Sequence, residues 1–161
     1  MMQNESLLPA SAPLAQGYEL RNGVNVRVDY VRHFSTAAGI VSTAPDVARF
    51  WGRLAGSGVI SRSSFERMIA PAVTARGDTL PYASGVFSQR YGGERVVWAY
   101  GLWTGNSSLM IHVPATGVTF VVLANSEQLS APHRLGAGHL TDSSLAREFL
   151  AAFVLPGAPL R

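Results

Sequence analysis

Apolar and polar residues alternate in several short segments, a pattern typical of strands with one buried face. From Val24 to Val28 every second residue is valine, and the preceding Asn22-Gly23 pair is typical of a two-residue hairpin turn. Four further segments have strand character and are joined by short turns: residues 82–90, 95–100, 107–113 and 118–125. Short turns between successive strands imply antiparallel pairing, so the pattern predicts an antiparallel sheet.

The last of these segments is apolar on both faces, because Val118, Phe120 and Val122 alternate with Val121 and Leu123. Such a strand is typical of the middle of a sheet that is covered on both sides. We therefore expect residues 118–125 to form a central strand.

Three segments have helical character. The first follows residues 42–46, where a capping hydroxyl, a proline and an acidic residue are typical of a helix start. The second runs from near Ser61 to Pro71. The third is expected to be capped by Thr141 or Asp142 and to bury one stripe made of Leu145, Phe149 and Phe153. Together the elements predict the α+β class, an antiparallel sheet flanked by helices.

The length of 161 residues suits one domain, and 47% hydrophobic against 14% charged residues favours a packed core. Residues 1–17 are rich in proline and short polar side chains and are predicted to form an arm or loop, with residues 18–161 as a single α+β domain. No apolar run approaches the length of a membrane span. The first residues show no secretory signal, so the sequence leaves localisation open.

The basic residues and the lack of cysteine exclude several kinds of binding and catalytic site. All 13 basic residues are arginine, and they are scattered, which does not favour nucleic-acid binding despite a net charge of +3. The chain has no lysine, so no mechanism that needs a lysine amine can be completed by these residues alone. It also has no cysteine, which excludes disulfides, thiolate metal sites and a cysteine nucleophile.

No catalytic or metal-binding set is complete among the remaining polar residues. His33, His112, His133 and His139 lack the spacing of a metal site, and no metal or other cofactor is expected. His112 lies on the strand face opposite Leu109, Ile111 and Val113, which favours a surface or second-layer histidine over a catalytic one. The carboxylates have structural explanations: Asp46 lies at a helix start, Glu66 forms an i, i+4 pair with Arg62, and Asp142 is a candidate N-cap.

One aromatic stretch, residues 98–108, joins two strand segments and holds Trp98, Tyr100 and Trp103 around Gly101. It is either a structural turn with core aromatics or the edge of a binding site. A glycine at a strand end lets a ligand approach the backbone, where neighbouring amides can donate hydrogen bonds.

Four stretches, in this order, resemble the C-terminal portion of the serine beta-lactamase-related hydrolases, which include class C beta-lactamases, penicillin-binding DD-peptidases and related esterases. Residues 14–18 (LAQGY) are similar to the family's Leu-Ala-x-Gly-Tyr, and residues 37–50 to its Ala-Gly-Gly-Leu-x-Ser-Thr helix start. Residues 82–87 resemble its Tyr-Gly-Leu-Gly-Trp strand, and residues 113–125 its Ile-Pro…Val-Val-Leu-x-Asn hairpin. The resemblance covers residues 14–153, nearly the whole chain.

The resemblance implies a serine nucleophile in a Ser-x-x-Lys motif, a Tyr-x-Asn or Ser-x-Asn element, and a Lys-Thr-Gly or His-x-Gly strand. The first two normally precede the matched region, and neither is found here. The third falls on Ala99, Tyr100 and Gly101, so alanine replaces the lysine or histidine. The resemblance then makes the Leu102 amide the second oxyanion-hole donor, and Tyr100, Gly101, Leu102 and Trp103 the substrate and oxyanion edge.

Two functions follow as hypotheses. The first is that the chain is the C-terminal part of a beta-lactamase-like hydrolase acting through an acyl-serine on an ester, amide or lactam. It would be inactive alone, without the nucleophile-bearing region, and able to self-associate through the apolar face that region would cover. The alternative is a non-catalytic binding module that uses an aromatic edge at Trp98–Trp103.

Overall fold

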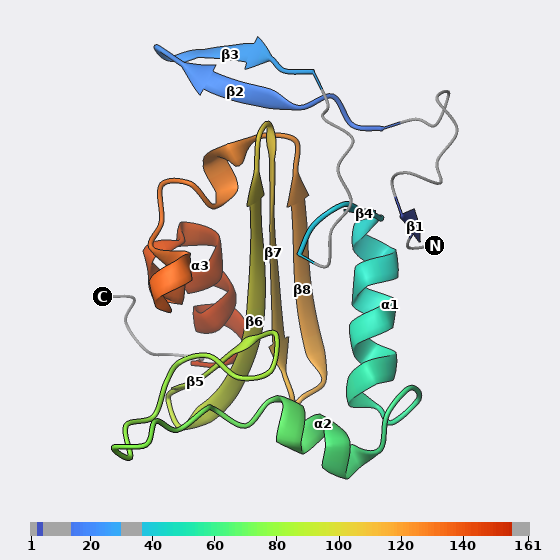
Figure 1. Ribbon diagram of the computed structural model, residues 1–161, viewed down its shortest axis with the longest axis vertical. Helices are drawn as coiled ribbons and strands as arrows, with labels where there is room; N and C mark the ends of the chain where they lie inside the picture. Colours follow the sequence, from blue (N-terminus) through green and yellow to red (C-terminus); the bar gives the residue numbers. More distant parts are fainter. Residues whose placement is uncertain (1–2, 5–13, 30–36, 156–161) are drawn as a thin grey trace.

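The computed structural model describes residues 3–4, 14–29 and 37–155 and confirms the α+β class (Figure 1). Its centre is a four-stranded antiparallel sheet with the strand order β5-β6-β7-β8. The strands are β5 (Phe87–Tyr91), β6 (Glu94–Trp103), β7 (Asn106–Val113) and β8 (Val118–Ala124). Two small antiparallel pairs accompany it: β1 (Gln3–Asn4) with β4 (Ile40–Val41), and β2 (Tyr18–Arg21) with β3 (Val24–Arg27).

Each α-helix begins at a hydroxyl side chain that accepts a hydrogen bond from a backbone amide of the first turn. Thr43 caps α1 (Ala44–Ala55), Ser61 caps α2 (Arg62–Met68) and Ser143 caps α3 (Ser144–Phe153). Three 3-10 turns precede α3: η2 (Glu127–Leu129), η3 (Leu135–Ala137) and η4 (Leu140–Asp142). No helix within the described ranges is both long and apolar enough to cross a membrane.

The cap and the buried stripe predicted for α3 are wrong. Thr141 and Asp142 belong to η4, and the cap is Ser143. The buried residues of the helix are Ala146, Phe149 and Leu150, whereas Leu145 and Phe153 are exposed. The i, i+4, i+8 spacing drifts around a helix with 3.6 residues per turn, so the i, i+3, i+4 set faces the sheet more closely.

Helices cover both faces of the sheet: α3 lies on one side, and α1 and α2 lie on the other (Figure 1). The α3 face is built around Trp98, which is fully buried and stacks on Phe87 with ring centroids 4.1 Å apart. The opposite face packs Val97 and Met110 against α1 and α2. Because side chains alternate along each strand, β6 and β7 contribute to both cores.

β8 lies at the edge of the sheet, so the prediction of a central position is wrong. Its apolar residues are still shared between the faces, with Phe120 packed toward α3 and Val121 toward α1. β7 holds an inner position instead, and five of its eight residues are consecutive and buried. Within the described part of the chain, β8 has one strand neighbour.

The β2–β3 hairpin turns at Asn22 and Gly23, both with positive φ, as the sequence predicts. It is joined to the β6–β7 turn through backbone contacts. The Tyr18 amide donates to the carbonyl oxygens of Gly105 (3.2 Å) and Asn125 (2.9 Å). A Cβ on Gly105, whose φ is +72°, would lie 2.3 Å from a methyl group of Val28. The two segments therefore meet at a contact that has no room for a side chain.

We expect Gly105→Ala to destabilise the protein by about 1–3 kcal/mol more than Gly117→Ala, because Ala at 105 also collides with Val28. Gly117 has the same φ of +72° and nothing within 4 Å of an added Cβ, so it reports the backbone strain alone. Urea unfolding of the two variants measures the difference. Equal losses of stability would show that the contact with Val28 is unimportant.

Candidate active-site edge

Strand β6 extends beyond its neighbour β5. β5 pairs with residues Glu94 to Trp98, whereas Ala99 to Trp103 pair with β7 alone. In the described ranges no strand lies beside this second half of β6 on the side of β5. The segment that the resemblance predicts as a substrate edge therefore lies along an open strand edge in the described ranges.

The two flanking turns decide which β6 backbone groups face that edge. Trp103 pairs with Asn106 across one two-residue turn, and Glu94 pairs with Tyr91 across the other. The pair that flanks such a turn is hydrogen-bonded, and bonding to a given neighbour then alternates along the strand. Both turns give the same alternation, so the amide and carbonyl groups of Tyr100 and Leu102 point away from β7. These groups face the open edge.

The side chains of the four predicted residues divide between the two faces of the sheet. Tyr100 and Leu102 share the α3 face, and Gly101 and Trp103 share the α1 face. Leu102 and Trp103 are 45% and 46% exposed. The four side chains therefore do not form one surface, whereas the backbone groups of Tyr100 and Leu102 face the same open edge.

Tyr100 is part of the aromatic packing on the α3 face. Its ring centroid lies 6.4 Å from that of Trp98 and 6.3 Å from that of Phe87. Its hydroxyl oxygen would lie 2.7 Å from a Cβ on Gly136, so the ring packs directly over the η3 backbone. The phenol therefore lies on the face opposite Gly101.

Gly101 makes room for a neighbour across the sheet. Ser108 is its partner on β7, and the Ser108 hydroxyl oxygen would lie 2.6 Å from a Cβ on Gly101. Neither Ser108 nor Gly136 was predicted from the sequence to lie at this edge. A two-residue turn at Thr104-Gly105 would have paired Ser108 with Gly101, whereas no local signal links Gly136 to Tyr100.

The aromatic-edge hypothesis needs Trp98, Tyr100 and Trp103 on one open surface, and the structure separates them. Trp98 is fully buried, and Trp103 lies on the opposite face. The alternation of side chains along a continuous strand causes this separation. Ala99, where the resemblance expects lysine or histidine, packs against the core beneath α1 and α2.

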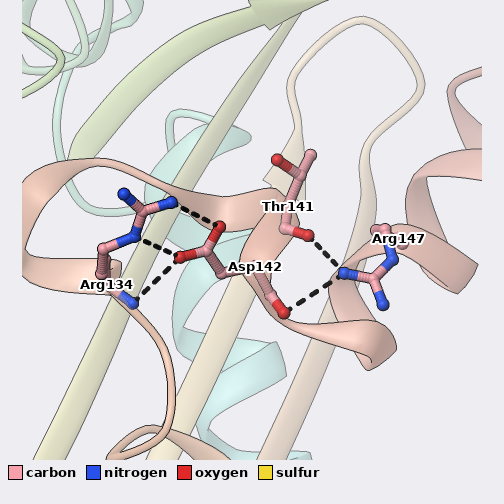
Figure 2. A network of polar contacts seen from close by, with 4 residues as sticks. All are labelled: Arg134, Thr141, Asp142 and Arg147. Carbon is pink, nitrogen blue, oxygen red and sulfur yellow. Dashed lines mark hydrogen bonds and ion pairs between the residues drawn. The ribbon is translucent and has the colours of Figure 1, made fainter. Parts of the chain in front are cut away.

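A polar network holds the loop that contacts Tyr100 (Figure 2). Arg134 donates from Nε to Asp142 at 2.9 Å, and its backbone amide donates to the same carboxylate at 3.3 Å. Arg147 of α3 donates to the carbonyl oxygens of Thr141 (2.6 Å) and Asp142 (3.2 Å). Hydrogen bonding to Arg134 lowers the pKa of Asp142, which keeps the carboxylate charged. The network closes the η3–η4 segment, with Leu135 and Leu140 buried beneath it.

The histidines do not form a site in the part of the chain that is described. His112 is 1% exposed, so it belongs to a second layer and not to the surface. Its Nδ1 lies 2.9 Å from the Thr119 hydroxyl, and its ring stacks on Trp51. Residues 37–155 and the other described positions hold no metal-binding cluster, and His33 lies outside the described residues.

Comparison with known proteins identifies the family. The family model named Beta-lactamase matches residues 5–142. The chain belongs to this family. No curated protein matches it.

Solved structures share the fold of this beta-lactamase family member at low sequence identity. An octameric penicillin-binding protein homologue from Pyrococcus abyssi aligns with 87% of the chain at 19% identity and a TM-score of 0.62. The D-amino acid amidase of Ochrobactrum anthropi SV3, in complex with L-phenylalanine amide, aligns with 78% of the chain at 22% identity and a TM-score of 0.58. The matches cover 35% and 39% of those two chains, so this chain spans well under half of either protein.

Burial lowers the pKa of His112, so the folded state favours its neutral form. Above the ordinary value of 6.5 this contribution to stability is complete, and it is lost as the pH falls below 6.5. We expect the free energy of unfolding to decrease by up to about 1.4 kcal/mol per pH unit in this range.

The pH dependence should disappear in His112→Phe, which retains a ring against Trp51 but cannot be protonated. Urea unfolding between pH 7.5 and 5 measures it. His139→Gln, at an exposed loop position, is the control and should keep the wild-type slope. An unchanged slope in His112→Phe would contradict the assignment.

Proposed function

We propose that this chain supplies the oxyanion side of a beta-lactamase-like serine hydrolase that acts on an ester, amide or lactam through an acyl-serine. The observation that carries the proposal is the open edge of β6, where the Leu102 amide points away from β7. A backbone amide at a strand edge is a fixed donor, so it stabilises negative charge without reorganising. It also tolerates side-chain replacement, which suits a strand that lacks the family's lysine or histidine.

In the proposed reaction the serine oxygen attacks the substrate carbonyl carbon, and the carbonyl oxygen becomes an oxyanion. The Leu102 amide donates a hydrogen bond to that oxygen, as the second donor beside the amide of the nucleophile itself. The leaving group departs to give the acyl-serine, which water then hydrolyses. The backbone groups of Tyr100 can align the substrate as an added strand along the same edge.

The nucleophile and its base come from outside these 161 residues in this proposal. The family's Ser-x-x-Lys motif requires lysine, and the chain has none. The proposal therefore expects the isolated chain to bind substrate groups at its edge without cleaving them.

Exposed apolar side chains in the described part of the sheet support a partner region outside these 161 residues. β8 has the composition of a central strand but lies at an edge, which leaves an apolar strand with one side unpaired in the described ranges. Leu123 on β8 is 44% exposed and shares the α1 face with Trp103, near the β6–β7 turn. Trp51 and Leu54 of α1 cover the other end of this face. The exposed part is continuous with the proposed oxyanion edge along β6.

The purified chain should show no turnover of nitrocefin or p-nitrophenyl esters and no labelling by a fluorophosphonate probe. The reason is that no serine in it has a lysine base. Turnover that is lost in Tyr100→Phe would contradict the proposal. We expect a Ser-x-x-Lys segment to be encoded beside this chain, and co-expression with that segment should restore labelling of its serine.

In the completed enzyme Leu102→Pro should lower kcat by about 10²–10³-fold, because it removes one oxyanion donor. Leu102→Ala keeps the amide and should change kcat by less than about 10-fold. Proline is tolerated at an open edge where the amide makes no ladder bond, so the strand should persist. Steady-state kinetics with one ester substrate compares the pair, and equal kcat values would remove Leu102 from the proposed site.

A further inference from the structure

A concave site lies away from the β6 edge, where the loop after α2 passes beside β5. It is a surface pocket of about 550 Å³, within the range of small-molecule sites. Its polar lining consists of Thr79, Ser88, Gln89, Arg90 and Arg95. Arg95 is seven residues before Leu102 on β6, which places the two about 23 Å apart along the strand. The pocket is thus separate from the proposed oxyanion edge.

The two arginines of the pocket are direct neighbours across the β5–β6 ladder. Arg90 pairs with Arg95, so two like charges face each other on one side of the sheet. Like charges in this position are unfavourable unless something neutralises them. Arg90 donates to the Gly93 carbonyl oxygen at 2.6 Å, and Arg95 donates to that of Ile69 at 3.4 Å. Both contacts are with neutral groups.

Acidic partners are common elsewhere in the structure but not at this pair. Arg49, Arg62 and Arg134 each form an ion pair with a carboxylate. No carboxylate of the described residues lies within 4.0 Å of Arg90 or Arg95, and no described lining residue is acidic. The pocket therefore holds uncompensated positive charge.

Ser88 adds an unused hydrogen-bond donor. It is 2% exposed, and its hydroxyl oxygen has no hydrogen-bond partner. It precedes Arg90 by two residues on β5, so its side chain shares the face of the two arginines. Its backbone amide donates to the Pro81 carbonyl oxygen at 2.8 Å, so the strand is held there without a hydrogen bond from the hydroxyl. A buried hydroxyl without a partner is unfavourable, so an acceptor in the pocket would be bound with a gain.

We propose that this pocket binds a small organic oxyanion, a carboxylate or phosphate group carried on an apolar body. The guanidinium groups of Arg90 and Arg95 provide paired donors that match such an anion, and the Ser88 hydroxyl donates a further bond. Pro71 and Leu80 line the pocket and provide the apolar wall. Inorganic phosphate can pair only with the arginines, whereas an aromatic phosphate can also pack its ring against Pro71 and Leu80. The proposal does not depend on the hydrolase function.

Isothermal titration calorimetry of the full chain with phenyl phosphate at low ionic strength tests the site. We expect one molecule to bind per chain and to raise the melting temperature, because the ligand binds the folded state. Benzyl alcohol and inorganic phosphate should each bind at least about 10-fold more weakly, since each lacks one of the two recognition elements. Absence of phenyl phosphate binding overturns the site, and equal binding of inorganic phosphate overturns the organic part of the assignment.

Two variants and one matched control separate a built site from general attraction to a basic protein. Arg90→Gln should weaken phenyl phosphate binding by about 10-fold or more, as expected for a lost charge-assisted bond. Arg27→Gln removes the same charge on the exposed β3 strand and should leave the affinity within about 2-fold. Equal effects of the two substitutions would show nonspecific attraction and overturn the proposal.

Ser88→Ala distinguishes a serine that binds the ligand from one with a structural role only. Removing an unpartnered buried hydroxyl should raise the melting temperature of the free protein and at the same time weaken phenyl phosphate binding several-fold. A variant that is more stable but binds phenyl phosphate unchanged would exclude Ser88 from the site and overturn the proposed donor set.

Discussion

The register between β6 and β7 is the constraint on which most of the structure depends. It is set at the turn, where Trp103 faces Asn106, and it continues to Val97 opposite His112. A shift of one residue would exchange the two faces of β6 and bring Trp98 out of the α3 core. The same register decides which backbone groups bond to β7 and which face outward. Packing and the proposed chemistry thus share one cause.

The two faces of the sheet differ in how far the described residues cover them. The α3 face is covered by a large cluster that includes Trp98, Leu109 and Phe149, and the η3–η4 segment contributes Leu135 and Leu140 to it. The opposite face is covered by α1 and α2 at one end, while Trp103 and Leu123 are nearly half exposed at the other. Exposed apolar surface of this kind is common at interaction sites, and it is part of the support for the proposed partner region.

Sequence patterns predicted which helices, strands and turns form better than they predicted the position of each strand in the sheet. The Asn22-Gly23 turn, the antiparallel pairing and the starts of α1 and α2 depend on local backbone preferences, which a short segment contains in full. The edge position of β8 depends on a neighbour that is not next to it in sequence, so composition alone misplaced it. The second strand was predicted to end at Tyr100, whereas it continues to Trp103. Gly101 interrupts the strand pattern in the sequence, because glycine is uncommon inside strands.

The candidate edge was located by the resemblance, whereas its geometry needed the pairing of the strands. The resemblance predicts that Tyr100 to Trp103 form this edge, but nothing local shows that their side chains point to opposite faces. His112 shows the same limit, since alternation gives its face but not the depth of burial beneath Trp51.

The hydrogen bonds that the Tyr18 amide donates to Gly105 and Asn125 have a consequence for folding. Asn125 also donates to the Gln16 carbonyl oxygen across 109 residues, so this end of the sheet joins segments that are far apart in the described sequence. Closures of such high contact order form slowly compared with hairpins and helical turns. We expect the β6–β7 hairpin to form early, because its contacts are local. The hydrogen bond between its turn and the segment at Tyr18 should form later. The donor edge would then be among the last parts of the molecule to gain its native rigidity.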